Sequence, residues 1–321
     1  MFEYLNGNKV IGYRESIVLW GNMTAPGIRT PPTIDSNSTA TISHRAISDN
    51  CGHDLGDCAV ATFRVMQLFP DVPQRLTNYY LTGRKGKCDK VFNLMAENFV
   101  NAHHLQTELK CFARLYFGTR SVSYMLDHGT WEKRLPTLET DMKAFRDLHY
   151  RQAGIDPGVK RDTLLLMEKR AGSHFANLGN ITELTVYLRD EFPNYRIQVA
   201  TWSDYNITEQ VHTMSRTRAM LALPGSDVMN AIFFQDNTPL VMYCRVMSEG
   251  EFDTSNERKF WFDRVKYVDA STEDCNSTNV TYWHKRVKGP GVGRGGAEIV
   301  KSFTFVNFES LKARLHRLGI E

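Results

Sequence analysis

Two groups of residues in this chain could bind or activate an oxygen-rich substrate, and the first is a turn with little side-chain bulk. Gly225 and Ser226 stand between an apolar run that ends at Leu223 and a helical pattern that begins near Asp227. A helix N-terminus presents free N–H groups and the positive end of the helix dipole, which suits a phosphate. Arg170 follows another apolar run and could neutralise the same phosphate. Alternatively, Gly225 only makes a tight turn, Ser226 only caps the helix and Arg170 is a solvated charge.

The second group is a histidine and an aspartate four residues apart at the start of an amphipathic helical pattern. If the helix begins by Gly52, His53 and Asp57 lie on one face of it. Asp57 could then hold the imidazole in one tautomer, and the pair would be a candidate general base. Asp57 acting alone, with His53 contacting the substrate, is a second interpretation. In a third, His53 is a polar cap, and Asp54 and Asp57 are first-turn acids favoured by the dipole.

Metal chemistry is the weakest interpretation of the remaining histidines and cysteines. None of the six cysteines forms a Cys-x-x-Cys pair, and His103-His104 is isolated. A metal hydrolase that uses Cys51, His53 or Asp57 therefore has little support from spacing, and free buried thiols are the default.

Regular elements must position these residues, and the stretch from Leu164 to Arg245 predicts them most clearly. Four apolar or alternating runs are separated by three helical patterns, which gives the order β-α-β-α-β-α-β. This alternation is typical of a parallel sheet covered on both faces. Two helices begin with the same four residue types, Asn180-Ile-Thr-Glu183 and Asn206-Ile-Thr-Glu209, which predict asparagine caps. Arg170 then lies at the carboxyl edge of the sheet, where doubly wound sheets bind ligands.

The amino-terminal side predicts a second set of elements. Residues 1–45 predict irregular or edge structure, because prolines and glycines interrupt every period. The helix that follows His53 ends at Pro70. Beyond it we expect a strand from Leu76 to Leu81, a helix from Val91 to Phe99, a strand from Cys111 to Phe117, a helix that closes at Gly154, and a linker at Asp156-Pro-Gly158.

The order of these motifs resembles glycosyltransferase family 61. An arginine after a strand, an Asn-x-x-Glu helix start and a Gly-small turn followed by Asn230-Ala-Ile-Phe-Phe234 are similar to the family's carboxyl-terminal half. Asn50, His53 and Asp57 form an Asn-x-x-His-x-x-x-Asp element similar to the one in its amino-terminal half. The two matches occur in the family's order and separation.

The chain departs from the family pattern at two positions. Pro224 stands where the family has histidine, and Met242 stands where it has glutamate. The donor contacts that those two residues make in the family cannot be carried over. A catalytically degenerate glycan-binding protein on the same fold is therefore an alternative to an active enzyme.

The resemblance implies an α/β protein of GT-B architecture, with two facing Rossmann-like domains, the donor in the second and the acceptor in the cleft. We therefore expect an acceptor-side domain at residues 1–156 and a nucleotide-sugar-binding domain at residues 157–300. Residues 301–321 are expected to form a terminal helix that crosses back onto the first domain.

The resemblance also implies an inverting transferase that uses a UDP-sugar donor, with xylose ahead of N-acetylglucosamine. Its acceptor would be an oligosaccharide or a glycoprotein glycan. No cofactor or metal is expected, since the sequence contains no Asp-x-Asp pair of the kind that GT-A enzymes use to hold a divalent ion. The diphosphate would instead be bound by residues around the predicted turn, which are Arg170, Arg216 or Arg218, Gly225, Ser226, Asp227 and Asn230.

Composition excludes several classes. The 321 residues carry a net charge of +3, and no basic run interleaved with aromatics indicates nucleic-acid binding. No apolar segment is long enough to span a bilayer, and the polar start predicts no signal peptide. We expect a cytoplasmic protein. The ER or Golgi lumen is the alternative if the chain is part of a longer protein, since six glycosylation sequons occur, at Asn22, Asn37, Asn180, Asn206, Asn276 and Asn279.

Overall fold

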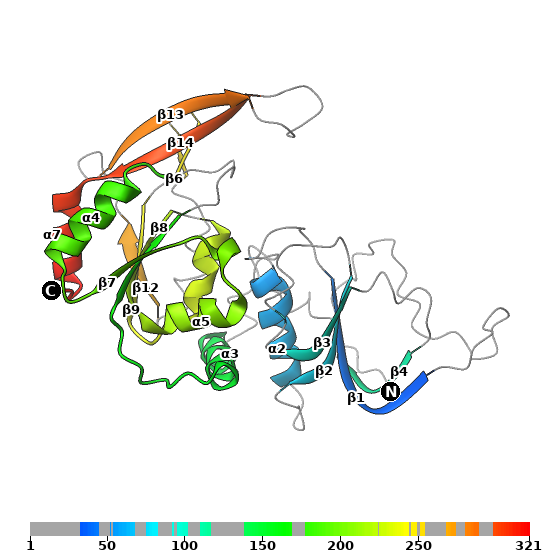
Figure 1. Ribbon diagram of the computed structural model, residues 1–321. Coiled ribbons are helices and arrows are strands. Elements are labelled where there is room, and N and C mark those ends of the chain that lie inside the picture. Colours follow the sequence, from blue (N-terminus) through cyan, green and yellow to red (C-terminus); the bar gives the residue numbers. More distant parts are fainter. Residues whose placement is uncertain are drawn as a thin grey trace.

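The computed structural model describes residues 33–44, 52, 54–67, 75–82, 92, 95–101, 110–116, 138–168, 177–223, 225–243, 245–248, 251–253, 268–273, 280–288 and 298–321. Within these ranges the protein is a mixed α/β structure with two parallel sheets (Figure 1). Among the described helices, none combines the length and the apolar character needed to cross a membrane.

A five-stranded parallel sheet forms the carboxyl-terminal half. Its strand order is β7-β5-β8-β9-β12, which is the doubly wound order 2-1-3-4-5 when the strands are numbered along the chain. The predicted alternation of strands and helices is confirmed. The elements are β5 (Thr163–Met167), α4 (Ile181–Glu191), β7 (Arg196–Ala200), α5 (Ile207–Arg216), β8 (Thr217–Ala222), the 3-10 helix η7 (Ser226–Phe233), β9 (Thr238–Met242) and β12 (Val268–Glu273).

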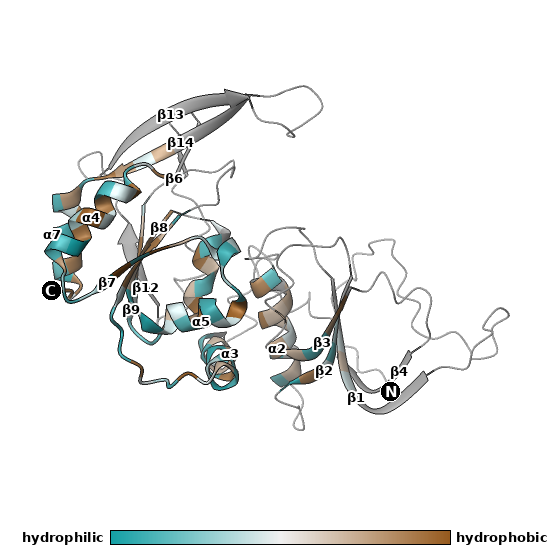
Figure 2. Ribbon diagram, viewed as in Figure 1, coloured by the Kyte–Doolittle hydropathy of each residue, from teal (hydrophilic) through white to brown (hydrophobic). Residues whose placement is uncertain are grey.

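Both faces of this sheet are buried, so successive strand residues enter different cores. In β5, Leu165 and Met167 belong to the core that includes α5 and η7, whereas Leu164 and Leu166 belong to the core that includes α4. Hydrophobic residues accordingly concentrate in the strands, while the covering helices also carry hydrophilic residues (Figure 2). This double burial explains why the strands read as continuous apolar runs.

A smaller sheet and the last helix cover the α4 side. The antiparallel pair β13 (Val280–Lys288) and β14 (Glu298–Val306) is extended by the short parallel strand β6 (Asn177–Leu178). Helix α7 (Phe308–Arg317) follows and lies beside α4 (Figure 1). The rings of Tyr187 and Phe308 stack with centroids 4.8 Å apart, and Leu311 and Leu315 are buried in the α4 core. The expectation that this helix crosses back onto the amino-terminal half is wrong, because its apolar face is occupied by α4.

The two similar helix starts have different partners. Asn206 forms the predicted capping box: its side-chain oxygen accepts from the Glu209 N–H at 3.0 Å, and its own N–H donates to the Glu209 carboxylate at 2.7 Å. Asn180 makes no cap. Its amide donates to the Val306 carbonyl at 2.9 Å and accepts from the Val306 N–H at 3.1 Å. The cap predicted at Asn180 is therefore wrong, because the Asn180 side-chain amide forms its hydrogen bonds with the Val306 peptide group of β14 instead.

The amino-terminal half contains a four-stranded parallel sheet in the order β3-β2-β1-β4. A π-helical segment, η1, leads into α2, and α2 packs on β4. The predicted strands β2 and β4 and the predicted helix at α2 are confirmed. The elements are β1 (Thr33–His44), η1 (Asp54–Val60), α2 (Ala61–Gln67), β2 (Leu76–Thr82), β3 (Ala96–Asn101) and β4 (Lys110–Tyr116).

Two expectations for this half are wrong, and strand pairing is the reason in both cases. Within the stretch 1–45, which was expected to be irregular or at an edge, residues 33–44 form β1, which pairs on both sides with a register shift between Asp35 and Thr39. Residues 1–32 and 45 lie outside the described ranges. The helix expected from Val91 to Phe99 is replaced by β3. Phe92 and Met95, which precede β3, are buried, and the Met95 N–H donates to the carbonyl of Phe92, a 3-10 helical residue, at 2.9 Å.

Helix α3 (Leu138–Ala153) contacts both halves. On one side, the Arg64 Nε of α2 donates to Asp141 at 2.9 Å, and the rings of Phe63 and Phe145 meet edge to face at 5.5 Å. The predicted helix end is confirmed, since Gly154 has a φ of 67°, a conformation that favours glycine. One continuous core therefore extends from the first sheet through α2 and α3 to the second sheet.

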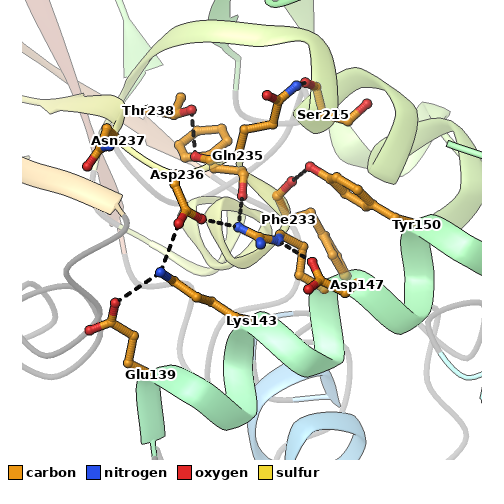
Figure 3. Close-up of polar contacts among 12 residues, drawn as sticks. Glu139, Lys143, Asp147, Tyr150, Ser215, Phe233, Gln235, Asp236, Asn237 and Thr238 are labelled. Atoms are coloured by element: carbon orange, nitrogen blue, oxygen red, sulfur yellow. Dashed lines mark hydrogen bonds and ion pairs between the residues drawn. The ribbon is translucent and has the colours of Figure 1, made fainter. Parts of the chain in front are cut away.

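On its other side, α3 is fastened to the segment between η7 and β9 (Figure 3). The Tyr150 hydroxyl donates to the Phe233 carbonyl at 2.5 Å. Asp236 accepts from Lys143 at 2.8 Å and from Arg146 at 2.6 Å. Since β9 begins at Thr238, these contacts lie at the amino edge of the second sheet. They attach α3 to the half that follows it in sequence.

His149 of α3 is a fully buried histidine between two phenylalanines. Its ring centroid is 4.1 Å from that of Phe145 and 5.2 Å from that of Phe233. Nδ1 lies 2.8 Å from the Phe145 carbonyl oxygen and must donate to it, while Nε2 is buried and has no hydrogen-bond partner in the described part of the chain. Burial lowers the pKa of His149 from 6.5 to about 4.

This histidine predicts a loss of stability in mild acid. The unfolded chain takes up a proton near pH 6.5, whereas the folded chain resists protonation of His149 until about pH 4. Stability is therefore full above the unfolded pKa and falls as the pH drops through this window, by about 3 kcal/mol at order of magnitude. Urea unfolding of wild type and His149→Leu at pH 7 and pH 4.5 measures the effect. The wild type should lose more free energy than the variant, and equal losses would contradict the prediction.

Candidate functional site

The topological switch point of the second sheet lies between β5 and β8. The chain leaves β5 towards β7 on one side, and later leaves β8 towards β9 on the other. Leu166 pairs with Leu221, so the two strands end nearly level, at Met167 and Ala222. In doubly wound sheets, ligands bind outside the carboxyl ends of the strands at this point. The loop after β8 therefore lies at the edge of the sheet where a ligand is expected to bind.

Gly225 gives that loop its shape. Its φ of 149° and ψ of −178° belong to a region that residues with a side chain rarely adopt. The Gly225 carbonyl accepts from the Val228 N–H at 3.2 Å, which closes the first turn of η7. The tight turn and the helix start thus occur together, and a backbone without a Cβ lies at the carboxyl edge. Ser226 and Asp227 follow it as the first residues of η7.

Asn230 has a structural partner. It is 7% exposed, and its amide donates to the Gln210 side-chain oxygen at 3.0 Å. This contact joins η7 to α5. Asp227, half-buried in the first turn of η7, accepts through its backbone carbonyl from the Trp202 indole at 2.9 Å. Trp202 was not identified from sequence. The signal that could have indicated it is its position two residues after the end of β7, at the carboxyl edge of the sheet.

Arg216 lies at the opposite edge of the sheet. It is the last residue of α5, which runs antiparallel to the strands, and its Nε donates at 3.2 Å to Asp162, the residue before β5. The same guanidinium holds the pKa of the Asp162 carboxyl below its ordinary value. Arg218 also turns away, since it donates to the Gly319 carbonyl at 2.8 Å. The structure therefore does not bring Arg216 or Arg218 to Gly225.

The other predicted site residues lie mostly outside the described ranges. Asn50, His53 and Arg170 are among the residues that the structure does not describe. The backbone of Asp57 is part of η1, in which Asp54 is fully buried. Asp54 is the first residue of η1, so its position is that of a first-turn acid. The pairing of His53 with Asp57 stays a prediction.

Comparison with known proteins identifies the family. No curated relative matches the chain. A family model matches residues 60–241, a range that begins in η1 and ends within β9. It therefore includes Arg170, Gly225 and Asn230 but not the predicted Asn50, His53 and Asp57 element. That model is described as Glycosyltransferase 61 and covers more than half of the chain, so the protein belongs to glycosyltransferase family 61.

Proposed function

We propose that this glycosyltransferase transfers xylose from UDP-xylose to a hydroxyl of a glycan acceptor, with inversion at the anomeric carbon and without a metal. The observation that carries the proposal is the turn at Gly225, where a positive-φ glycine opens a helix at the carboxyl end of β8. A diphosphate can approach such a backbone closely and accept hydrogen bonds from the N–H groups of the first turn.

A GT-B arrangement is part of the proposal. Two parallel sheets joined through α2 and α3 support it, with the nucleotide sugar on the second sheet and the acceptor on the first. Arg170 follows β5, the strand beside β8, and supplies the cationic side chain for the diphosphate. Asn230 contributes by holding η7 in place rather than by contacting the donor. We also propose a cytoplasmic location.

The proposed reaction is a direct displacement. The acceptor oxygen attacks the anomeric carbon from the face opposite UDP, and the bond between that carbon and the phosphate oxygen breaks. UDP leaves with the electron pair of the broken bond. His53, oriented by Asp57, takes the proton of the acceptor hydroxyl as the new bond forms. The positive end of η7 and Arg170 stabilise the negative charge that develops on the diphosphate.

An assay of UDP release in the presence of EDTA tests donor class and metal independence together. The full chain is incubated with UDP-xylose or UDP-N-acetylglucosamine and with xylan or mannose-containing oligosaccharides. We expect release to be fastest with UDP-xylose and xylan, and unchanged within about twofold by EDTA, because cationic and backbone groups neutralise the diphosphate. Loss of activity in EDTA with recovery in manganese would contradict the metal-independent mechanism.

A non-catalytic glycan-binding protein is the second candidate. Met242, which ends β9 where the family has glutamate, is 2% exposed and apolar, so it offers no polar contact to a donor. Glycan binding without UDP release from any donor in the assay would favour this candidate over the enzyme.

A further inference from the structure

We propose that Trp202 is a positioning residue that fixes the first turn of η7 for the nucleotide-sugar donor. Trp202 begins the short helix η6 (Trp202–Asp204), in the loop after β7 at the carboxyl edge of the sheet. The inference rests on the proposed function, because it concerns the same turn. It adds a residue that neither the sequence motifs nor the family match assigns.

The contact between Trp202 and η7 is direct and partly buried. Trp202 is 6% exposed, and its indole N–H donates to the Asp227 carbonyl at 2.9 Å. An indole nitrogen can only donate, so this carbonyl satisfies its single hydrogen-bonding group. Asp227 is two residues after Gly225. The ring of Trp202 also meets that of Tyr205 edge to face, with centroids 5.7 Å apart, which limits its rotation.

Gln210 of α5 also binds the loop that carries Trp202. Its side-chain N–H₂ donates to the Trp202 carbonyl at 3.2 Å and to the Tyr205 carbonyl at 3.1 Å. Its side-chain oxygen accepts from Asn230 at 3.0 Å. Helix η7 is therefore held at Asp227 and at Asn230, which are one 3-10 turn apart. Trp202, Gln210 and Asn230 together form what we call the η7 brace.

The brace matters because glycine does not fix its own conformation. Gly225 can adopt its φ of 149° without steric cost, but it can adopt many other angles as readily. Holding Asp227 selects one arrangement of the N–H groups that follow Gly225. A preorganised cradle lowers the cost of binding the donor. Loss of the brace should therefore weaken donor binding more than it slows the chemical step.

Tyr150 provides a matched control on the same helix. Its hydroxyl donates to the Phe233 carbonyl, so it holds the last turn of η7 as Trp202 holds the first. Trp202→Phe and Tyr150→Phe each remove one hydrogen bond to a backbone carbonyl of η7. The two variants differ in which end of the helix is released.

The experiment measures KM for UDP-xylose, kcat and Tm for the wild-type chain of 321 residues and for both variants. We expect Trp202→Phe to raise KM about threefold to tenfold with kcat within about threefold, since one neutral hydrogen bond is lost. Tyr150→Phe should lower Tm but leave KM within about twofold. Equal changes of KM in both variants, or no change in Trp202→Phe, would overturn the positioning role.

A second variant separates the hydrogen bonds from the bulk of the indole ring. Gln210→Met keeps Trp202 and the helix propensity of α5 but removes all three Gln210 contacts, so KM should again rise without a matching fall in kcat. This variant carries the test if Trp202→Phe does not fold. A wild type that uses no nucleotide sugar would overturn both the proposed function and the brace. An active wild type with unaltered KM in Trp202→Phe and Gln210→Met would overturn the brace alone.

Discussion

Gly225→Ala should lose most of its affinity for UDP-xylose and UDP while it still folds. At a φ of 149° and a ψ of −178°, a side chain costs about 1 to 3 kcal/mol, so the turn must move to relieve the strain. In the proposed site, the moved turn would no longer aim the first N–H groups of η7 at the diphosphate. We expect about a 10-fold to 100-fold increase in the dissociation constant, measured by calorimetry.

Gly154→Ala is the control for backbone strain. Gly154 also has a positive φ, of 67°, and a Cβ there would meet no atom within 4 Å. It ends α3, away from the carboxyl edge of the second sheet. The control variant should lose stability and keep its UDP affinity. If Gly225→Ala bound UDP as tightly as wild type, the diphosphate would have to lie elsewhere.

The largest effect on turnover is expected at the predicted general base. His53→Ala and Asp57→Asn should each lower kcat about 100-fold or more, because general-base catalysis typically contributes about 10² to 10⁴. In the proposed mechanism both residues act on the acceptor side, so UDP binding should stay nearly unchanged. Steady-state kinetics with saturating UDP-xylose, paired with UDP titration of each variant, makes this measurement.

The two variants also separate the interpretations of this pair. A large loss in Asp57→Asn with a small loss in His53→Ala would assign the proton transfer to Asp57 alone. Turnover within a few-fold of wild type in both variants would remove the pair from the mechanism. Unfolding midpoints measured on the same samples exclude a loss that arises from misfolding, which matters because Asp54 and Cys58 beside Asp57 are buried.

Sequence periodicity predicted the second half of the protein well because its strands are buried on both faces. Runs such as Leu164 to Met167 are typical of strands in the interior of a covered parallel sheet, and in β5 their side chains enter both cores. The start of helix α5 was predicted equally well, since Asn206 and Glu209 form the reciprocal hydrogen bonds of a capping box within one turn. Local chemistry was sufficient wherever the partners were close in sequence.

Prediction failed where partners came from distant parts of the chain. Asn180 has the same helix-start sequence as Asn206, yet its partner is Val306, 126 residues away. β1 and β3 depend on pairing with neighbouring strands, which no local pattern encodes.

In the candidate site, Gly225 was found because the turn requires glycine. Trp202 was missed because its contact with Asp227 spans 25 residues. Arg216 was grouped with the donor residues although a strand follows it at once, which fixes it at the amino edge.

The attachment of α3 to the second half has a mechanical consequence. Because Lys143 and Arg146 bind Asp236, α3 belongs to the body of the second sheet, and the seam between the two halves runs through the contact of α2 with α3. Arg64 at this seam is 5% exposed, and its Nη1 is buried without a hydrogen-bond partner among the described residues. Parting the seam would let water reach that nitrogen and recover part of the free energy lost with the contact. The seam therefore opens at a lower cost than a fully satisfied one of the same area, which would favour entry and release of the donor in the proposed GT-B arrangement.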